Sequence, residues 1–312
     1  MTGTGKQTDP YIITTVEELY SMLEIGGNGV YFRLGADIDF NGTPYAENFS
    51  VIPIKCREFD GNGHCIRNIY INSTSTVSIF RPYSNSDGTN TAIKNLRLEN
   101  ISLVGSSVNI FKSSPNSAML DLTGCTFLIN FTNITSSIKS SEIGNLMNDN
   151  YAMLNFDLCT ISVKGTSNYP FPVISYSNFK RSHLCIDIDI RHGMSSYSQS
   201  IAIFNSSILV DSYLTGSIRY HDEGNSNYMQ IANSLSTAQN FYMAIELAGR
   251  SEFYCDMETK TDCFFDSELI GGAVHKIYNS TKCDKFHALT TAQCKDADYL
   301  NSIGFICAGD SP

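Results

Sequence analysis

The residues of this chain that most suggest chemistry are two carboxylates in a strand-like segment, Asp187 and Asp189 in the run 185–190. Two residues apart on a strand, they share one face at a separation of about 6.6 Å. That separation suits an inverting glycosidase, in which one carboxyl is the general acid and the other the general base. A working sugar site also needs aromatic platforms, and the chain contains no Trp. Because outward positions of a half-solvated strand are polar by default, we expect surface carboxylates rather than a catalytic pair.

Other clusters that could support catalysis or bind a metal ion give a weaker signal. Arg191 and His192 follow Asp189, but a lyase-type mechanism needs its base beside clustered acidic calcium ligands. The segments 148–150 and 222–225 are rich in oxygen ligands, yet they lack the spacing of a calcium loop. The ten Cys and six His do not interleave at zinc-ligand intervals. No nucleophile elbow, P-loop or dinucleotide fingerprint is present, so no catalytic residue, metal or cofactor is predicted.

The cysteines bear on the redox environment of the chain. Five of the ten lie at or after Cys255, which could suggest a disulfide-stapled tail. Residues 1–15 contain no apolar h-region, so we recognise no secretory signal peptide. Thiols of a protein made in the cytosol stay reduced. We therefore expect reduced cysteines, and in particular a free, inward-pointing thiol at Cys125.

The composition limits the classes of partner. Lys and Arg number 21 against 31 Asp and Glu, which gives a formal net charge of −10. Phosphate binding needs clustered Lys and Arg, so nucleic acid and anionic membrane surfaces are poor candidates. No apolar stretch reaches the roughly 18 residues of a membrane span. Hydrophobic residues make up 42% of the chain, which is enough for a core and argues against disorder.

From about residue 64 to residue 247 the sequence repeats at intervals near 30 residues. The repeated apolar runs end at Phe80, Phe111, Leu146, Ile174, Phe204 and Ile231. Apolar and polar residues alternate at period two within the repeats, and the alternation resets across two-residue polar corners. No sustained helical period is present, and a sandwich would show hairpin signals without a constant period. The pattern predicts an all-β fold, a right-handed parallel β-helix in which each coil covers the last.

A second repeated unit lies between those runs. Residues 96–105 align without gaps on residues 156–165. Leu120, Leu122, Cys125 and Phe127 fit the same frame. This alignment turns Cys125 inward and can place Asp121 and Asp157 outward on coils near Asp187. The abundant residues, 38 Ser and 27 Asn, are then expected at corners and in ladders between coils.

The two ends of the chain differ from the repeats. Thr15 and Glu18 fit a capping box, and we expect one short amphipathic helix over 15–25 that covers the open end of the coil. Short strands are expected over 30–34 and 38–40, followed by a tight turn at 60–63. Beyond residue 247 we expect irregular strands, then a small helix near 289–296. The predicted organisation is an N-terminal cap (1–63), the coils (64–247) and a closing segment (248–312).

Several tyrosines could take part in recognition. The candidates are Tyr169, Tyr176, Tyr197, Tyr220 and Tyr228. If exposed, they can stack on sugars or line a subunit contact. Packing in the core or in solvated loops is the alternative for each of them.

The chain also resembles a known family. The opening of GLUG-type β-helix proteins is similar to Thr4-Gly5, 9–13, 15–19, 34–40 and 59–64, and their closing segment is similar to 289–293, Lys295-Asp296 and Gly304-Phe305. The Gly-Leu-Phe-Gly core of the family's motif is replaced here, by Ser78-Ile79-Phe80-Arg81 for example. Proteins of this family occur on bacterial surfaces and in bacteriophage virion appendages, and they share no catalytic motif.

The resemblance implies a structural or receptor-binding subunit of a virion appendage, a fibre or spike. Such a protein would reside in the virion, form a homo-oligomer, with a trimer suspected, and contact other virion proteins or host surface polysaccharide. No membrane insertion is expected. A bacterial cell-surface adhesin of the same fold is one alternative, and a polysaccharide depolymerase is another.

Overall fold

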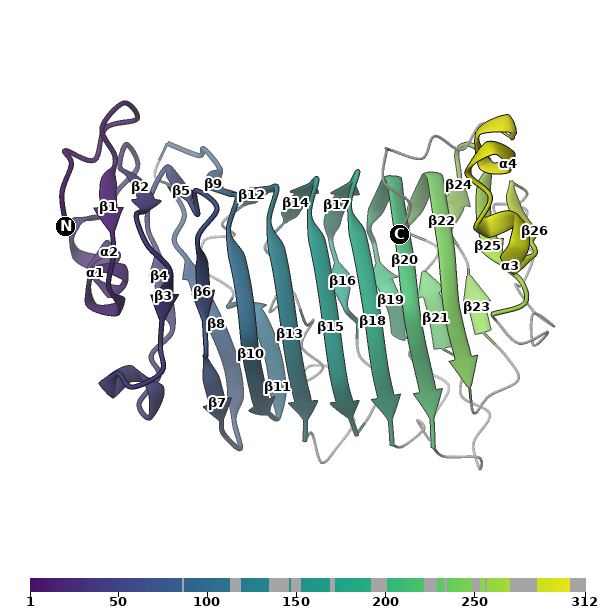
Figure 1. The fold of residues 1–312 in the computed structure, drawn as a ribbon, viewed down its shortest axis with the longest axis horizontal. Helices are drawn as coiled ribbons and strands as arrows, with labels where there is room; N and C mark the ends of the chain where they lie inside the picture. The colour runs from purple at the N-terminus through teal and green to yellow at the C-terminus, as the bar shows by residue number, and fades with distance from the viewer. Residues whose placement is uncertain are drawn as a thin grey trace.

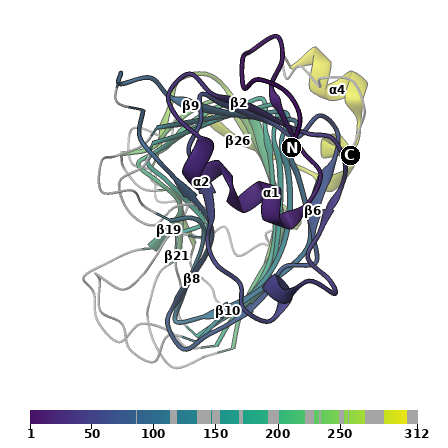
Figure 2. The ribbon, with the colours of Figure 1, turned by 90° about the vertical axis from the view of Figure 1, so that its left-hand side faces the viewer.

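The protein is described here by a computed structural model covering residues 1–85, 87–112, 119–134, 146, 153–168, 172–191, 201–221, 229–232, 235–248, 253–255, 257–269 and 285–303. Strands dominate, and all of their pairings are parallel within this part of the chain. The strands stack as successive turns of one coil (Figure 1). Seen from the N-terminal end, the chain runs clockwise as it recedes (Figure 2), so the coil is right-handed. The predicted parallel β-helix is confirmed.

The coil has three lines of strands. The line of short strands comprises β1 (Tyr11–Ile13), β2 (Tyr31–Leu34), β5 (Glu58–Asp60), β9 (Thr91–Lys94), β12 (Leu120–Thr123), β14 (Leu154–Asp157), β17 (Ser177–Lys180) and β24 (Glu258–Thr259). The line of long strands comprises β3 (Ile38–Asp39), β6 (Cys65–Arg67), β7 (Tyr70–Asn72), β10 (Arg97–Gly105), β13 (Thr126–Asn133), β15 (Thr160–Ser167), β18 (His183–Ile190), β25 (Cys263–Asp266) and β26 (Phe286–Leu289). Two longer strands, β20 (Ile208–Tyr220) and β22 (Thr237–Ala248), bend through the corner and serve both lines.

The third line carries the predicted repeat. Its strands are β4 (Ile52–Ile54), β8 (Thr76–Pro82), β11 (Ser107–Phe111), β16 (Ile174–Ser175), β19 (Ile201–Asn205), β21 (Met229–Ala232) and β23 (Phe253–Cys255). Phe80 lies opposite Phe111, and Ile174 lies opposite Phe204, as the spacing of the apolar runs predicts. The predicted interval between the last two runs is one residue too short, because Phe204 lies opposite Ala232 rather than Ile231.

The ungapped alignment of residues 96–105 on 156–165 is wrong in register. Through β13, the residue stacked above Arg97 is Thr160, and the residue stacked above Ile101 is Val163. A bulge between Leu98 and Ile101 changes the offset from three residues to two. Beyond the bulge the slip is two residues, which keeps side chains on their predicted faces, since faces alternate at period two. The hydropathy pattern therefore could not detect that part of the error. Before the bulge the slip is three residues, and Leu158, aligned on the buried Leu98, is exposed.

The corner between the short and long lines is two residues wide, as predicted, but its residues are not all polar, contrary to the prediction. Its first residue has a left-handed backbone in successive coils: Asn95, Gly124, Leu158, Arg181, Asp211 and Asn240. Its second residue points inward and is buried: Leu96, Cys125, Cys159, Ser182, Ser212 and Phe241. Asn and Gly adopt this conformation readily. Leu158 shows that an exposed apolar residue can also hold the corner.

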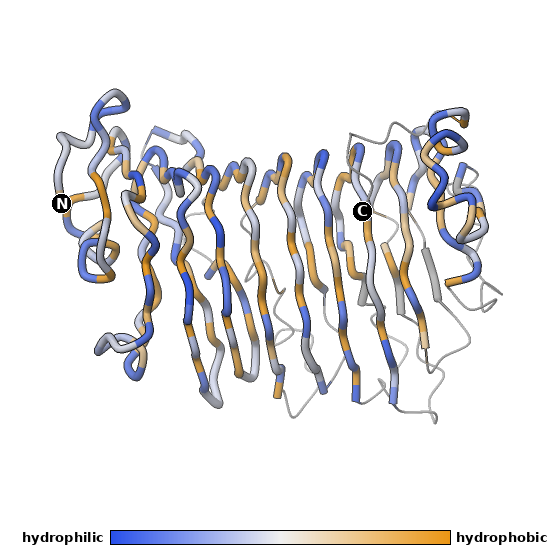
Figure 3. The backbone as a smooth tube through the Cα atoms, viewed as in Figure 1, coloured by the Kyte–Doolittle hydropathy of each residue, from blue (hydrophilic) through white to orange (hydrophobic). Residues whose placement is uncertain are grey.

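The interior is filled by side chains that stack from coil to coil. Phe156, Phe179, Phe204 and Phe241 form one such stack, with consecutive ring centroids 5.6, 6.0 and 5.9 Å apart. Colour alternates along the strands in Figure 3 because inward residues are apolar and outward residues polar. The rings bury large areas and touch at distances typical of favourable aromatic pairs. Each coil thus rests on the one before it, which is why a single coil would be unstable.

The N-terminal helix is split in two. α1 (Val16–Tyr20) starts after Thr15, whose hydroxyl accepts the Glu18 N–H as the capping pattern predicts, and α2 (Met22–Ile25) follows Ser21. The Glu18 carboxylate accepts the N–H of Thr14, one residue earlier than a capping box requires. The two helices lie across the end of the coil (Figure 2). A short 3-10 helix (Pro44–Ala46) follows β3.

The strand lines run across both predicted boundaries, before residue 64 with β2 and β5 and after residue 247 with β25 and β26. The C-terminal helices α3 (Thr291–Cys294) and α4 (Ala297–Ser302) lie outside the coil (Figure 2). They cover outward side chains of the long line, because Phe264, Leu289 and Leu300 form a small buried cluster separate from the main core. No helix in the described ranges is long and apolar enough to cross a membrane.

Candidate functional site

The chemistry-bearing side chains lie on the outer face of the long line, over β15, β18 and β20. Strict alternation along β18 buries Leu184, Ile186, Ile188 and Ile190 and leaves the residues between them partly exposed. Asp187 lies between Lys164 on β15 and Ser217 on β20, and Asp189 lies opposite Arg219. Asp187 and Asp189 therefore share one face, as their spacing predicts.

Both carboxylates are engaged by neighbours on adjacent coils. Asp187 Oδ2 lies 3.1 Å from Lys164 Nζ, and Asp187 Oδ1 lies 3.1 Å from Arg219 Nη1 and accepts the Ser217 hydroxyl at 2.7 Å. Asp189 Oδ1 lies 3.5 Å from the same Arg219 nitrogen and 3.4 Å from His221 Nε2. The two carboxyls form a single ionic network spread over three coils.

The electrostatics of this network disfavour acid catalysis by Asp187. The Ser217 hydroxyl and the Lys164 ammonium hold the pKa of Asp187 below its ordinary value, because both stabilise the ionised carboxylate. A general acid needs the opposite, a raised pKa that keeps its proton at working pH. Asp187 and Asp189 are also 34% and 37% exposed, so neither is held in a desolvated pocket. The arrangement is that of partly exposed carboxylates paired with cationic side chains of adjacent coils.

An aromatic row runs beside the ionic network. His183 and Tyr213 are stacked with ring centroids 4.3 Å apart and planes at 25°, and His183 Nε2 lies 2.7 Å from the Thr215 hydroxyl oxygen. Burial lowers the pKa of His183, which favours its neutral form. In register, the row continues through Tyr242 and Phe264, where α3 and α4 cover it. The open part of the row is thus the His183–Tyr213 pair.

This row was missed from the sequence. His183 and Tyr213 are 30 positions apart, and the hydropathy pattern does not fix which residue of the next coil lies opposite. If the buried residues of successive coils are aligned first, His183 and Tyr213 are placed side by side. Leu184 pairs with Leu214, so the residues before them must also be neighbours.

Asp121 and Asp157 do not join the network around Asp187. Both are partly exposed, but they lie on β12 and β14 in the short line, around the corner from β18. Asp121 accepts hydrogen bonds from the amides of Asn90 and Asn155, and Asp157 forms a two-point ion pair with Arg181. These carboxylates hold coils together.

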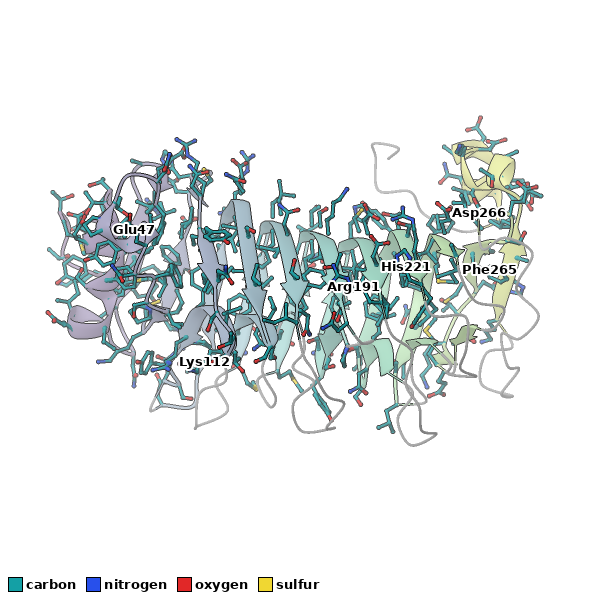
Figure 4. The ribbon with its side chains drawn as sticks, turned by 90° about the horizontal axis from the view of Figure 1, so that it is seen from below. Glu47, Lys112, Arg191, His221, Phe265 and Asp266 are labelled. Atoms are coloured by element: carbon teal, nitrogen blue, oxygen red, sulfur yellow. The ribbon has the colours of Figure 1, made fainter. Side chains whose placement is uncertain are left out.

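The other candidate residues have mixed outcomes. Arg191 is exposed and lies beside His221 (Figure 4); the two residues directly follow the C-terminal ends of β18 and β20, and the backbone N–H of His221 donates to the Ile190 carbonyl at 3.0 Å. Tyr176 is exposed, whereas Tyr220 points into the core and is 6% exposed, so it cannot form a sugar platform. His192, Tyr169, Tyr197, Tyr228 and the loops 148–150 and 222–225 lie outside the described residues.

Within the described ranges, no group of three His, Cys, Asp or Glu side chains lies close enough together to hold a metal ion. Cys125 is buried and points inward as predicted, and Cys56, Cys65, Cys125, Cys159, Cys185 and Cys294 form no disulfide. The site therefore consists of hydrogen-bonding and ionic side chains on a flat, rigid sheet, next to one stacked ring pair.

Comparisons with known proteins add little to this description. No family model matches the chain, and no curated protein matches it. Among solved structures, a Bacteroides ovatus chain described as a "putative immunoglobulin A1 protease" is similar with a TM-score of 0.45 and 15% identity, over 88% of this chain and 89% of that one. A likeness of this kind carries no information about activity.

Proposed function

We propose that this chain is a non-enzymatic structural or receptor-binding subunit of a bacteriophage virion appendage, and that its long outer face binds host surface carbohydrate. The observation that carries the proposal is the ionic network around Asp187 and Asp189. The best acid pair of the chain is tied to Lys164, Arg219 and His221 on an open sheet face. Resemblance to GLUG-type proteins gives the virion as the expected location.

The physical properties of the face suit binding to a polar chain of sugars. Thr215 and Arg219 present donors, and the two aspartates present acceptors, at the fixed spacing of neighbouring coils. Side chains that are already ordered lose little rotamer entropy when a ligand binds. The Tyr213 ring adds an apolar body with a polar tip, a combination enriched at recognition surfaces. These features favour recognition over turnover.

The test separates binding from cleavage. The native chain and the Asp187→Asn/Asp189→Asn double variant are incubated with purified host surface polysaccharide, and both bound polysaccharide and newly formed reducing ends are measured. We expect binding by the native chain, weaker binding by the double variant, and no reducing ends from either. Asp157→Asn is the matched control, because it removes an ion-paired carboxylate from another face and should leave binding unchanged.

Two outcomes would overturn the proposal. If the native chain releases reducing ends and the double variant does not, the protein is a depolymerase and the two aspartates are catalytic. If the Asp157→Asn control weakens binding as much as the double variant does, the long face is not the binding surface.

We also infer that the working form is a homo-oligomer, with a trimer expected from the family resemblance. A row of exposed apolar side chains supports lateral contact, since Met119, Met153 and Tyr176 begin successive coils of the short line and are 41%, 44% and 46% exposed. Contiguous apolar surface of this kind marks association sites. Light scattering at micromolar concentration should find an assembly that Met153→Ser weakens. A strict monomer would contradict the inference.

A further inference from the structure

A column of sulfur and oxygen atoms runs up the inside of the corner between the short and long lines. Its members in four successive coils are Cys125, Cys159, Ser182 and Ser212, each at most 1% exposed. The Ser182 hydroxyl oxygen accepts the Cys159 N–H at 3.0 Å, and the Ser212 hydroxyl oxygen accepts the Ser182 N–H at 3.3 Å. In the same way, the Cys159 sulfur accepts the Cys125 N–H. In this column, thiols and hydroxyls alike accept hydrogen bonds from backbone N–H groups at the corner.

Cys125 and Cys159 occupy this position on adjacent coils. The Thr160 N–H donates to the Cys125 carbonyl at 2.8 Å, which fixes the register, and the two thiols contact each other. Neighbouring parallel strands lie about 4.8 Å apart, within the Cα separation of about 4.4–6.8 Å that a disulfide spans. Other strand cysteines face different residues, since Cys185 lies between Ser162 and Thr215.

We propose that Cys125 and Cys159 form an oxidation site at which hydrogen peroxide joins two adjacent coils by a disulfide. The same disulfide forms whichever of the two reacts first, and we take Cys159 as the residue that does so. Its sulfur gains one peroxide oxygen as the O–O bond breaks, giving a sulfenic acid and one water. The Cys125 sulfur then attacks, the S–O bond breaks, the S–S bond forms, and a second water leaves. The two thiols are oxidised and the peroxide is reduced to two waters.

The burial of the pair sets its behaviour. A small neutral oxidant can reach the column, whereas bulky disulfides cannot without opening the coil. The partly exposed Cys185 thiol should therefore react sooner, but it has no cysteine opposite and ends as a sulfenic or sulfinic acid. The disulfide would covalently link two coils that are otherwise held together by side-chain stacking and hydrogen bonds. This inference does not depend on the proposed function.

The experiment uses the full reduced chain. It is treated with increasing hydrogen peroxide, quenched, denatured and alkylated, and its peptides are analysed by mass spectrometry. We expect a linked peptide joining Cys125 to Cys159, and a melting temperature several degrees above that of the reduced chain. Cys159→Ser should fold normally, because it extends the Ser182 and Ser212 ladder by one coil, and it should give no linked peptide and no rise in melting temperature.

A matched control and two contrary outcomes complete the test. Cys185→Ser removes the more accessible thiol and should leave the linked peptide unchanged. If Cys125 and Cys159 are both recovered as alkylated thiols after peroxide has fully oxidised Cys185, the proposal is wrong. A linked peptide that joins either residue to a different cysteine would overturn it equally.

Discussion

Among the described glycines of the long line, Gly216 leaves the least room for a Cβ. This residue lies within β20, opposite Ile186, with φ of +114°. A Cβ at this position would lie 1.7 Å from the Ile186 carbonyl oxygen. Raising that distance to 3.0 Å, below which real Cβ atoms are essentially never found, requires a local shift of about 1.3 Å. Gly216→Ala therefore cannot be accommodated without moving a coil away from its neighbour.

The expected cost follows from two terms. A φ near +114° in a residue with a Cβ costs about 1–3 kcal/mol. A local shift of this size breaks about two interstrand hydrogen bonds, each with a net value near 1 kcal/mol. The free energy of unfolding should therefore fall by about 3–5 kcal/mol. With an unfolding entropy of about 2.1 cal/mol/K per residue over 312 residues, each kcal/mol lowers the melting temperature by about 1.5 °C, and the total drop is about 5–8 °C.

Two further variants separate the two terms. Gly63 has φ of +80° and nothing within 4 Å of its missing Cβ, so Gly63→Ala carries the backbone cost alone and should lower the melting temperature by about 2 °C. Gly165 has no positive φ, but its Cβ would lie 2.0 Å from the Phe131 carbonyl oxygen, so Gly165→Ala carries the collision alone. Differential scanning calorimetry of the three variants measures both terms. If Gly216→Ala melts within about 2 °C of Gly63→Ala, the reasoning about coil spacing is refuted.

Two other predictions concern single carboxylates. Ser217 and Lys164 lower the pKa of Asp187, so the stability it provides is present above the unfolded-state pKa of about 3.9 and is lost as the pH falls through the lower folded-state value. Asp187→Asn should therefore lower the melting temperature at pH 7 and leave it unchanged near pH 2, whereas equal drops at both values would contradict the assignment. Asp266 is 1% exposed and accepts the Thr291 hydroxyl at 2.9 Å, together with two backbone N–H groups. Asp266→Ala should free α3 and α4 at a cost of about 2–3 kcal/mol, seen as faster proteolysis after Leu289, and an unchanged digestion rate would contradict it.

The coil was predictable because its burial pattern is periodic. Every coil must bury one apolar run on the third line, so Phe80, Phe111, Ile174 and Phe204 recur at nearly constant spacing. The corners were predictable for a similar reason, since a left-handed residue followed by an inward one resets the alternation. The register was not predictable, because a slip of two residues leaves every face unchanged. The stacked pair His183 and Tyr213 was hidden by this ambiguity.

The ends of the chain were predictable only in part. The spacing of Val16 and Leu19 identifies a helix with an apolar face, but it does not show the break at Ser21 that splits the helix. The C-terminal helices illustrate a different limit. The apolar side chains of the C-terminal helices must pack against the coil, but residues 289–296 do not show whether they pack against its open end or its outer surface. In the structure they pack against Phe264 on the outer surface, in a cluster whose members come from three separate segments.

The same coil period gives paired aspartates a second, structural interpretation in a fold of this kind. Three aspartates on the outside are matched by an arginine one coil further along: Asp39 by Arg67, Asp157 by Arg181, and Asp187 by Arg219, at sequence separations of 28, 24 and 32. Two carboxylates on one strand look like an acid–base pair when only the strand is considered. One coil on, an arginine already forms a hydrogen bond to each of these three carboxylates. In a parallel β-helix, a catalytic pair should be proposed only where the next coil lacks that cation, because only then can one carboxyl keep its proton.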